Sequence, residues 1–313
     1  SLVGSEMCIR DSKSKQQEHI ANLFCENKIQ DGDYFLYTDA WNPTVIQLKY
    51  MSELLGVKIK IGGMWHAGSY DPADFLGRLI GDAPWVRHAE RSMFEIFDDN
   101  FFATEFHLDM FCREFGYEKF ELTNSGKAHI VGWPMEYLKS ELEGFDSVAK
   151  ENIILFPHRI APEKQVDIFK DLADTLPEYD FIVCQEQKLT KDEYHTLLGK
   201  AKIVFSANTQ ETLGISCYEG ALVGATPMVP DRLSYTEMYD NDFLYPSDWT
   251  IDFETYKMNK DLVVAHIRKV MAENDKDYID RLATNLSQTF FSGKALYDVI
   301  SSCLLYTSDA ADE

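Results

Sequence analysis

Short apolar runs alternate with segments of helical periodicity along most of the chain. Apolar runs bounded by polar turns are typical of buried strands, and apolar residues three or four positions apart indicate helices packed on a core. Regular alternation of strand and helix favours parallel sheets. We predict strands at 34–37, 57–61, 100–103, 128–131, 152–157, 181–184, 203–205 and 226–229, and helices at 15–28, 46–55, 165–176, 192–198 and 213–222.

A polar, helix-like segment at 135–150 interrupts this alternation, directly after the turn Gly132-Trp133-Pro134. The chain has 313 residues, which is enough for two domains. We therefore predict an α/β protein with two doubly wound, Rossmann-like domains. The first covers residues 13–147 and the second covers 148–302.

The two ends, 1–12 and 303–313, show neither periodicity nor turn signals. Their segments MCIRDS and CLLYTS can be encoded by DNA stretches that are reverse complements over most of their length, as two inward-facing transposon ends would be. We interpret both ends as adapter-derived, non-native parts of a metagenomic fragment, and exclude them from the fold prediction. Genuine terminal tails are the alternative.

The charge and cysteine content narrow the function classes. The net charge is −22, of which the two ends contribute −1 and −3, leaving −18 for residues 13–302. An acidic chain disfavours non-specific binding to nucleic acid or anionic membranes. No apolar run approaches the roughly 20 residues of a membrane span. The scattered cysteines show no zinc-ligand spacing and predict a reducing cytoplasm; they are Cys25, Cys112, Cys184 and Cys217.

The stretch 203–231, IVFSANTQETLGISCYEGALVGATPMVPD, is the most informative in the chain. It predicts a buried strand, a polar loop and a helix beginning near Gly214. Backbone N–H groups and the helix dipole at such a start favour an anion. Glu211 lies in the loop and Glu219 lies about two helical turns further on. A solvated helix face is the alternative interpretation of this glutamate pair.

A second polar loop, 158–164, follows the first predicted strand of the second domain. Its Arg159 and Lys164 lie where the carboxyl ends of parallel strands open toward ligands. Arginine offers a planar fork to phosphate oxygens and lysine offers a mobile point charge. Plain surface charges are the alternative.

The first domain has one candidate loop, 62–70, after its second predicted strand. Gly62 and Gly63 would allow close approach of a ligand, and His66 follows them. An ordinary loop with a packed tryptophan is the alternative.

Two Asp-x-Asp triplets, 31–33 and 240–242, match common turn chemistry, and we predict no metal site. The other histidines considered show no ligand spacing and are interpreted as structural; they are His88, His107, His129, His158 and His195.

Two of these segments resemble signatures of the retaining GT-B glycosyltransferases (glycosyl transferases group 1, family 4-like). Glu-x7-Glu with EGALVGATPMV is similar to the family's E-A-x-A-x-G-x-P-V-V, and RIAPEK is similar to G-R-L-x-x-E-K-G. His158 and Gln165 replace the two glycines of the second pattern. The family's first domain usually begins with a strand and a glycine-rich loop, so the resemblance also implies a truncated first domain.

The resemblance implies roles for single residues. Arg159 and Lys164 would bind the donor diphosphate, Glu211 would contact the sugar hydroxyls, and Glu219 would contact the ribose. His66 would face the sugar across the cleft. The backbone amides at the helix start would hold the distal phosphate; they belong to Thr212, Leu213 and Gly214.

The implied activity is transfer of a sugar from a nucleotide-diphosphate sugar to an acceptor hydroxyl with retention, without metal or other cofactor. The acceptor stays open between a glycan, a lipid-linked molecule and a nucleic-acid base, and the oligomeric state stays open too. One alternative is a phage-type enzyme acting on modified nucleic-acid bases, for which the arginines of 78–91 give a thin basic patch. A non-catalytic nucleotide-sugar-binding protein and a sugar-nucleotide epimerase of the same fold are the others.

Overall fold

The computed structural model describes residues 2–81 and 83–309, with side chains described for 13–81 and 83–302. The chain divides into two compact units. Unit 1 contains the chain up to Ala103, His107–Val131 and the segment from Lys294 on. Unit 2 contains Thr104–Phe106 and Gly132–Gly293.

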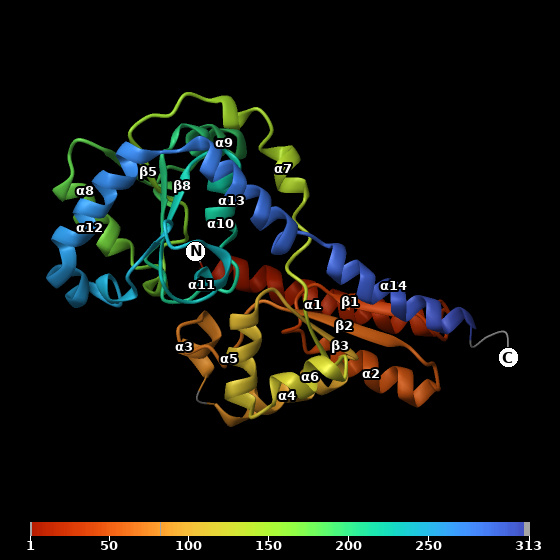
Figure 1. Cartoon of the computed structure of the whole chain (residues 1–313). Coiled ribbons are helices and arrows are strands. Elements are labelled where there is room, and N and C mark those ends of the chain that lie inside the picture. The colour runs from red at the N-terminus through yellow and green to blue at the C-terminus, as the bar shows by residue number, and fades with distance from the viewer. Residues whose placement is uncertain (1, 82, 310–313) are drawn as a thin grey trace. The chain divides into compact units, whose positions relative to one another are not determined.

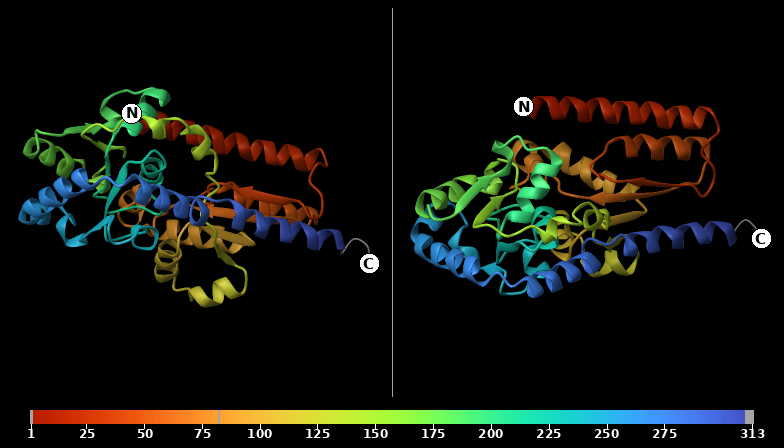
Figure 2. Two further views of the ribbon diagram at one scale, coloured as in Figure 1. Left: turned by 45° about the horizontal axis from the view of Figure 1, so that its top comes forward. Right: turned by 90° about the horizontal axis from the view of Figure 1, so that it is seen from above.

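Unit 1 is built on a parallel sheet in the order β1-β2-β3-β4 (Figure 1). Its core is aromatic: the Trp65 ring stacks on Phe102 at 6.3 Å and lies 5.1 Å from Phe111. Helix α1 runs alongside α2, as Figure 2 shows. The strands are β1 (Tyr34–Tyr37), β2 (Lys60–Trp65), β3 (Asp99–Phe102) and β4 (Ala128–Ile130); the helices are α1 (Leu2–Cys25), α2 (Thr44–Leu55), α3 (Phe75–Ile80), α4 (Pro84–Ile96), α5 (Glu105–Phe115), α6 (Lys119–Asn124) and α14 (Lys294–Asp309).

The glycine pair of unit 1 belongs to strand β2, not to a ligand loop as predicted. A Cβ atom on Gly62 would lie 2.2 Å from the Tyr34 hydroxyl, and one on Gly63 would lie 2.6 Å from the Phe97 ring. Aromatic side chains therefore occupy the space that the prediction left for a ligand. The strand ends at Trp65, and His66 is the first residue beyond it.

Unit 2 contains a five-stranded parallel sheet in the order β6-β5-β7-β8-β9. Helices α8 and α12 cover one face, and α9, α10 and α13 cover the other (Figure 1). The strands are β5 (Ile153–Phe156), β6 (Asp180–Val183), β7 (Ile203–Phe205), β8 (Thr226–Pro230) and β9 (Leu244–Tyr245); the helices are α7 (Tyr137–Glu141), α8 (Val166–Thr175), α9 (Lys191–Lys200), α10 (Ile215–Leu222), α11 (Tyr235–Met238), α12 (Phe253–Glu273) and α13 (Lys276–Thr289), with short 3-10 helices η1 (Phe145–Ser147), η2 (Pro162–Lys164), η3 (Cys184–Glu186) and η4 (Ser247–Trp249).

The division between the units differs from the boundary predicted at 147/148. The segment from Gly132 to Glu136 is attached to the end of α13: the Trp133 amide donates to the Phe290 carbonyl at 2.8 Å. A Cβ on Gly132 would lie 2.5 Å from that same carbonyl oxygen, so the two backbones touch. The polar composition of 135–150 marked a surface connection, and this segment belongs to unit 2.

Both chain ends are helical where the structure describes them, whereas the sequence pattern gave no element there. Helix α1 begins at Leu2, and α14 continues to Asp309. Once a turn has formed, each added helical residue costs little, so a helix extends into flanking sequence of weak periodicity. Within the described ranges, no helix combines the length and apolar character needed to cross a bilayer.

Candidate nucleotide-sugar site

The strand order of unit 2 defines where a ligand is expected. From β5 the chain moves outward to β6, and then returns to place β7 on the other side of β5. In doubly wound sheets the crevice outside the carboxyl ends of such a strand pair is the usual ligand site. The loop 157–164 leaves β5 and the loop 206–214 leaves β7, so both predicted signatures meet at this switch point.

Lys164 joins the two loops. Its side chain is only 8% exposed, and its Nζ donates to the Gln210 carbonyl at 2.6 Å and to Glu211 Oε2 at 3.2 Å. A buried ammonium needs such partners, because desolvation without them is costly. The lysine therefore lies in the loop after β5 and is directed at the loop before α10.

Gln165, the residue after Lys164, has a left-handed backbone conformation at the position where the resembled pattern has glycine. Its φ is +52°, in the left-handed region. The side chain compensates, because Nε2 donates to the carbonyls of Ala207 at 2.5 Å and Thr250 at 2.7 Å. The loop thus has a glycine-like conformation without a glycine.

Glu211 lies in the loop that leads into α10, before the N-cap residue Gly214. Its Oε1 accepts hydrogen bonds from the amides of Thr212 at 3.2 Å and Leu213 at 3.5 Å. Burial raises the pKa of this carboxyl, but Lys164 and the Gly214 amide outweigh burial and hold the pKa below its usual range. The amides predicted for a phosphate are therefore next to an ionised carboxylate of the chain itself.

Gly214 is required at the helix start. Its φ is +73°, and a Cβ there would lie 2.8 Å from the Tyr235 ring. Tyr235 is itself fixed by the Ser206 hydroxyl at 3.0 Å and by Asn208 Nδ2 at 3.1 Å. The loop after β7 is thus held in place by buried polar contacts.

Arg159 lies at the rim of the site with its side chain 54% exposed. Its Nε and Nη2 both donate to Glu163 Oε1, at 3.1 and 2.6 Å. The Glu163 carboxylate fixes one edge of the guanidinium, and about half of the Arg159 side chain remains exposed to solvent.

A pocket of about 410 Å³ adjoins this arginine. Tyr194, which lines it, donates its hydroxyl to Glu219 Oε2 at 2.8 Å, and burial raises the pKa of Glu219. Burial also lowers the pKa of His158 to about 4, so this histidine is neutral at pH 7. The lining residues are Pro157, His158, Arg159, Cys184, Gln185, Lys188, Leu189 and Tyr194, and they include two cationic side chains and no carboxylate.

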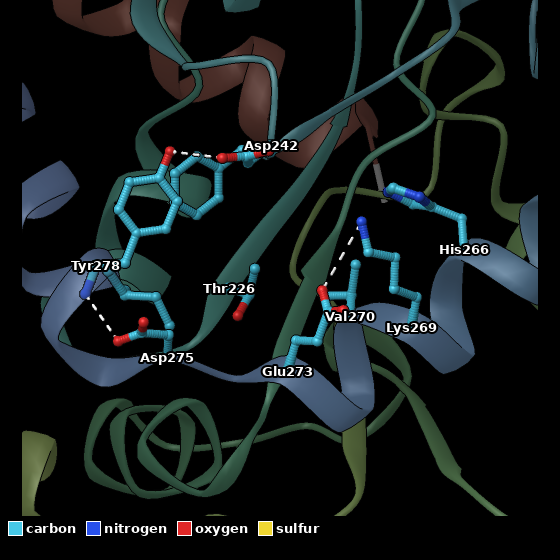
Figure 3. Close-up of a pocket in the computed structure, with 10 residues that line it drawn as sticks. Thr226, Asp242, His266, Lys269, Val270, Glu273, Asp275 and Tyr278 are labelled. Atoms are coloured by element: carbon cyan, nitrogen blue, oxygen red, sulfur yellow. Dashed lines mark hydrogen bonds and ion pairs between the residues drawn. The ribbon is translucent and has the colours of Figure 1, made fainter.

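A second pocket of unit 2, of about 430 Å³, has the opposite character (Figure 3). It lies by Thr226, the first residue of β8, and so at the amino ends of the strands. Its lining includes three carboxylates, Asp242, Glu273 and Asp275, and Lys269 lies 3.8 Å from Glu273. A diphosphate would be repelled there, so the pocket beside Arg159 suits an anion better.

The sequence analysis missed Arg232, which fastens the loops of the site. Its guanidinium donates to the carbonyls of Asn208 at 2.7 Å, Ala207 at 2.8 Å, Ser247 at 3.0 Å and Thr250 at 3.0 Å. Its place in the loop that follows the strand predicted at 226–229 was the available signal. Arg232 therefore holds the loop after β7 to the segment after β9.

In unit 1, His66 is exposed, and its Nε2 lies 2.6 Å from the Thr38 carbonyl. The loop that follows is held by Glu90, whose side chain is fully buried. Its Oε1 accepts from the Ser69 amide at 2.6 Å and from Trp41 Nε1 at 2.8 Å, and its Oε2 accepts from the Ser69 hydroxyl at 2.7 Å. The predicted contact of His66 with a sugar stays a prediction.

The aspartate triplets take part in local structure. Asp31 Oδ1 accepts from the Lys58 amide at 2.7 Å, and Asp33 Oδ2 accepts from the Gln30 amide at 2.8 Å. Asp242 Oδ2 accepts from the Tyr278 hydroxyl at 3.1 Å. Among the described residues, no group of three or more His, Cys, Asp or Glu side chains is arranged to hold a metal ion.

No protein-family model and no curated protein sequence matches the chain. Solved structures do match its fold. A pneumococcal O-GlcNAc transferase, GtfA, in complex with UDP and GlcNAc gives a TM-score of 0.59 at 13% identity, over 94% of this chain and 60% of that one. The catalytic domain of Arabidopsis thaliana starch synthase IV, bound to ADP and acarbose, gives 0.56 at 11% identity, over 92% and 76%.

A third similar structure is S. aureus TarM, in complex with Fondaparinux, alpha-GlcNAc-glycerol and UDP, with a TM-score of 0.57 at 13% identity over 91% of this chain and 58% of that one. All three are GT-B glycosyltransferases. The chain therefore has the α/β fold of the GT-B class, as the sequence predicted. It spans about 60% of the length of the two bacterial transferases.

Proposed function

We propose that the chain belongs to a glycosyltransferase that moves a sugar from a nucleotide-diphosphate sugar to an acceptor hydroxyl, with retention of anomeric configuration and without a metal. The supporting observation is the set of hydrogen-bond donors at the switch point of unit 2. Buried Lys164, half-exposed Arg159 and the amides that lead into α10 lie in the loops after β5 and β7, and a pocket of about 410 Å³ without a lining carboxylate adjoins Arg159.

In this proposal, each part of the crevice binds one part of the donor. The pocket lined by Tyr194 takes the nucleoside, and Glu219, held by the Tyr194 hydroxyl, binds the ribose. Arg159, Lys164 and the backbone amides that lead into α10 bind the diphosphate. These donors stabilise the charge that develops on the leaving diphosphate, which is usually the largest catalytic contribution in such a site.

In this proposal, retention needs no protein nucleophile. The acceptor hydroxyl enters from the face on which the diphosphate leaves, and the diphosphate oxygens take up its proton. Glu211 contacts the hydroxyls of the donor sugar, and His66 is the candidate sugar contact from unit 1. The acceptor, which defines the biological role, is not assigned.

A binding experiment tests the proposal. UDP, ADP and GDP are titrated into the chain by calorimetry, with Arg159→Ala and Glu219→Ala in parallel. Losing a charge-assisted pair of hydrogen bonds weakens binding by tenfold or more, so we expect at least that loss in the Arg159→Ala variant. Binding of one nucleotide that is equally tight in the variants contradicts the proposed site.

The chain offers a matched control. Arg268 is 56% exposed, and its Nε and Nη2 both donate to Glu178 Oε1, at 3.2 and 2.9 Å, as Arg159 does to Glu163. Arg268→Ala removes the same charge and the same kind of ion pair from helix α12, and should leave nucleotide binding unchanged. Transfer of labelled sugar from the matching donor to water or to candidate acceptors then distinguishes an enzyme from a binding protein.

A further inference from the structure

The carboxylate of Glu211 lies against backbone amides that the sequence analysis assigned to a donor phosphate. It accepts hydrogen bonds from the amides of Thr212 and Leu213, in the loop that leads into α10. A helix start favours one anion, because its N–H groups and its dipole point to the same place. Here that anion belongs to the protein.

Two further donors surround the same carboxylate. Lys164 Nζ lies 3.2 Å from Oε2, and Asn208 Nδ2 lies 3.3 Å from the same oxygen. Backbone amides, an ammonium and a side-chain amide are also the groups that bind phosphate oxygens. Glu211 is thus bound as a phosphate would be.

We infer that Glu211 is an internal competitor for the donor phosphate. The phosphate displaces the carboxylate from the amides and from Lys164, because two anions cannot share these donors. The displaced carboxylate then becomes available for the donor sugar, so phosphate binding precedes sugar recognition. This inference rests on the proposed function and adds a regulatory contact to the same site.

The test uses the full chain and two probes, UDP and inorganic pyrophosphate, titrated by calorimetry. Glu211→Gln keeps the size of the side chain and an acceptor oxygen, but it removes the charge that strengthens the self-contact. We expect the variant to bind both probes about tenfold more tightly than the wild type. Glu186→Gln is the control. Glu186 is an exposed carboxylate that pairs with Lys170 at 2.8 Å, and it follows Gln185, which lines the pocket. This substitution should change binding less than twofold.

A second measurement needs no substitution. In the labelled wild-type chain, pyrophosphate should shift the carboxyl carbon signal of Glu211 together with the amide signals of Thr212 and Leu213. Amide shifts with a stationary Glu211 signal overturn the inference.

The outcomes separate the inference from the proposed function. If the wild type binds UDP and Glu211→Gln binds it equally or more weakly, the competitor role is overturned while the donor site stands. If neither protein binds either probe, both are overturned. Tighter binding in Glu211→Gln but not in Glu186→Gln supports the inference.

Discussion

Replacement of Gln165 separates two effects that the structure combines at one residue. The left-handed backbone costs a non-glycine residue about 1 kcal/mol. The two hydrogen bonds from Nε2 to Ala207 and Thr250 offset this cost, at about 0.5–1.5 kcal/mol each. We use the lower value for each hydrogen bond, because Arg232 also donates to both carbonyls and keeps them bonded when Gln165 is replaced.

Gln165→Ala loses both hydrogen bonds and keeps the strained backbone, so unit 2 should lose about 1 kcal/mol of its free energy of unfolding. Gln165→Gly loses the same bonds but relieves the strain, so it should lose about 1 kcal/mol less than the alanine variant. Urea unfolding, followed by pulsed hydrogen exchange of peptides from unit 2, measures both. With a urea dependence of about 1–3 kcal/mol per molar, the two midpoints should differ by about 0.3–1 M. An alanine variant as stable as the glycine variant would show that backbone strain at Gln165 is not significant.

Two further predictions concern buried groups. Glu90→Leu removes the acceptor of three hydrogen bonds in unit 1 and should cost at least about 3 kcal/mol. Glu90→Gln can keep all three if the Ser69 hydroxyl reverses its role, so urea unfolding of unit 1 should rank it near the wild type; equal losses in both variants would contradict this hydrogen-bond account. His158 has its pKa lowered by burial, and then by Lys164, to about 4, below the usual 6.5. Between these values the unfolded chain binds a proton that the folded unit excludes, so stability falls as the pH falls, by about 2–3 kcal/mol from pH 7 to 4.5. His158→Asn should flatten that part of the stability curve, and an unchanged slope would refute the assignment.

The sequence predicted the framework of unit 2 because its strands are short apolar runs followed by polar loops. The strands at 153–156 and 203–205 and the helix after Gly214 were found, and the switch point follows from their order. Helix α12 was missed, since its apolar positions are diluted by charged residues. Its capping box, Asp252 with Thr255, was a signal for its start.

The candidate site was predicted as a set of residues, but not as a set of contacts. Lys164 and Glu211 were found in separate loops, and only the pairing of β5 with β7 brings them to 3.2 Å. The ion pair between Lys164 and Glu211 depends on that tertiary pairing, which no local pattern encodes. The glycines of β2 show the reverse error. Their lack of a side chain was interpreted as space for a ligand, whereas the side chains of Tyr34 and Phe97 fill that space.

The order of the strands in unit 2 also bears on when the proposed nucleotide site forms during synthesis. Ile154 on β5 pairs with Ile203 on β7, and the complete β6 and α9 segment lies between them in the chain. Such distant pairings form late and slowly, because closing the intervening loop costs entropy before contacts repay it. A partly folded chain would therefore contain formed helices and no crevice. A nucleotide would bind only after the central pair of strands has closed, and would then draw the population toward the folded state.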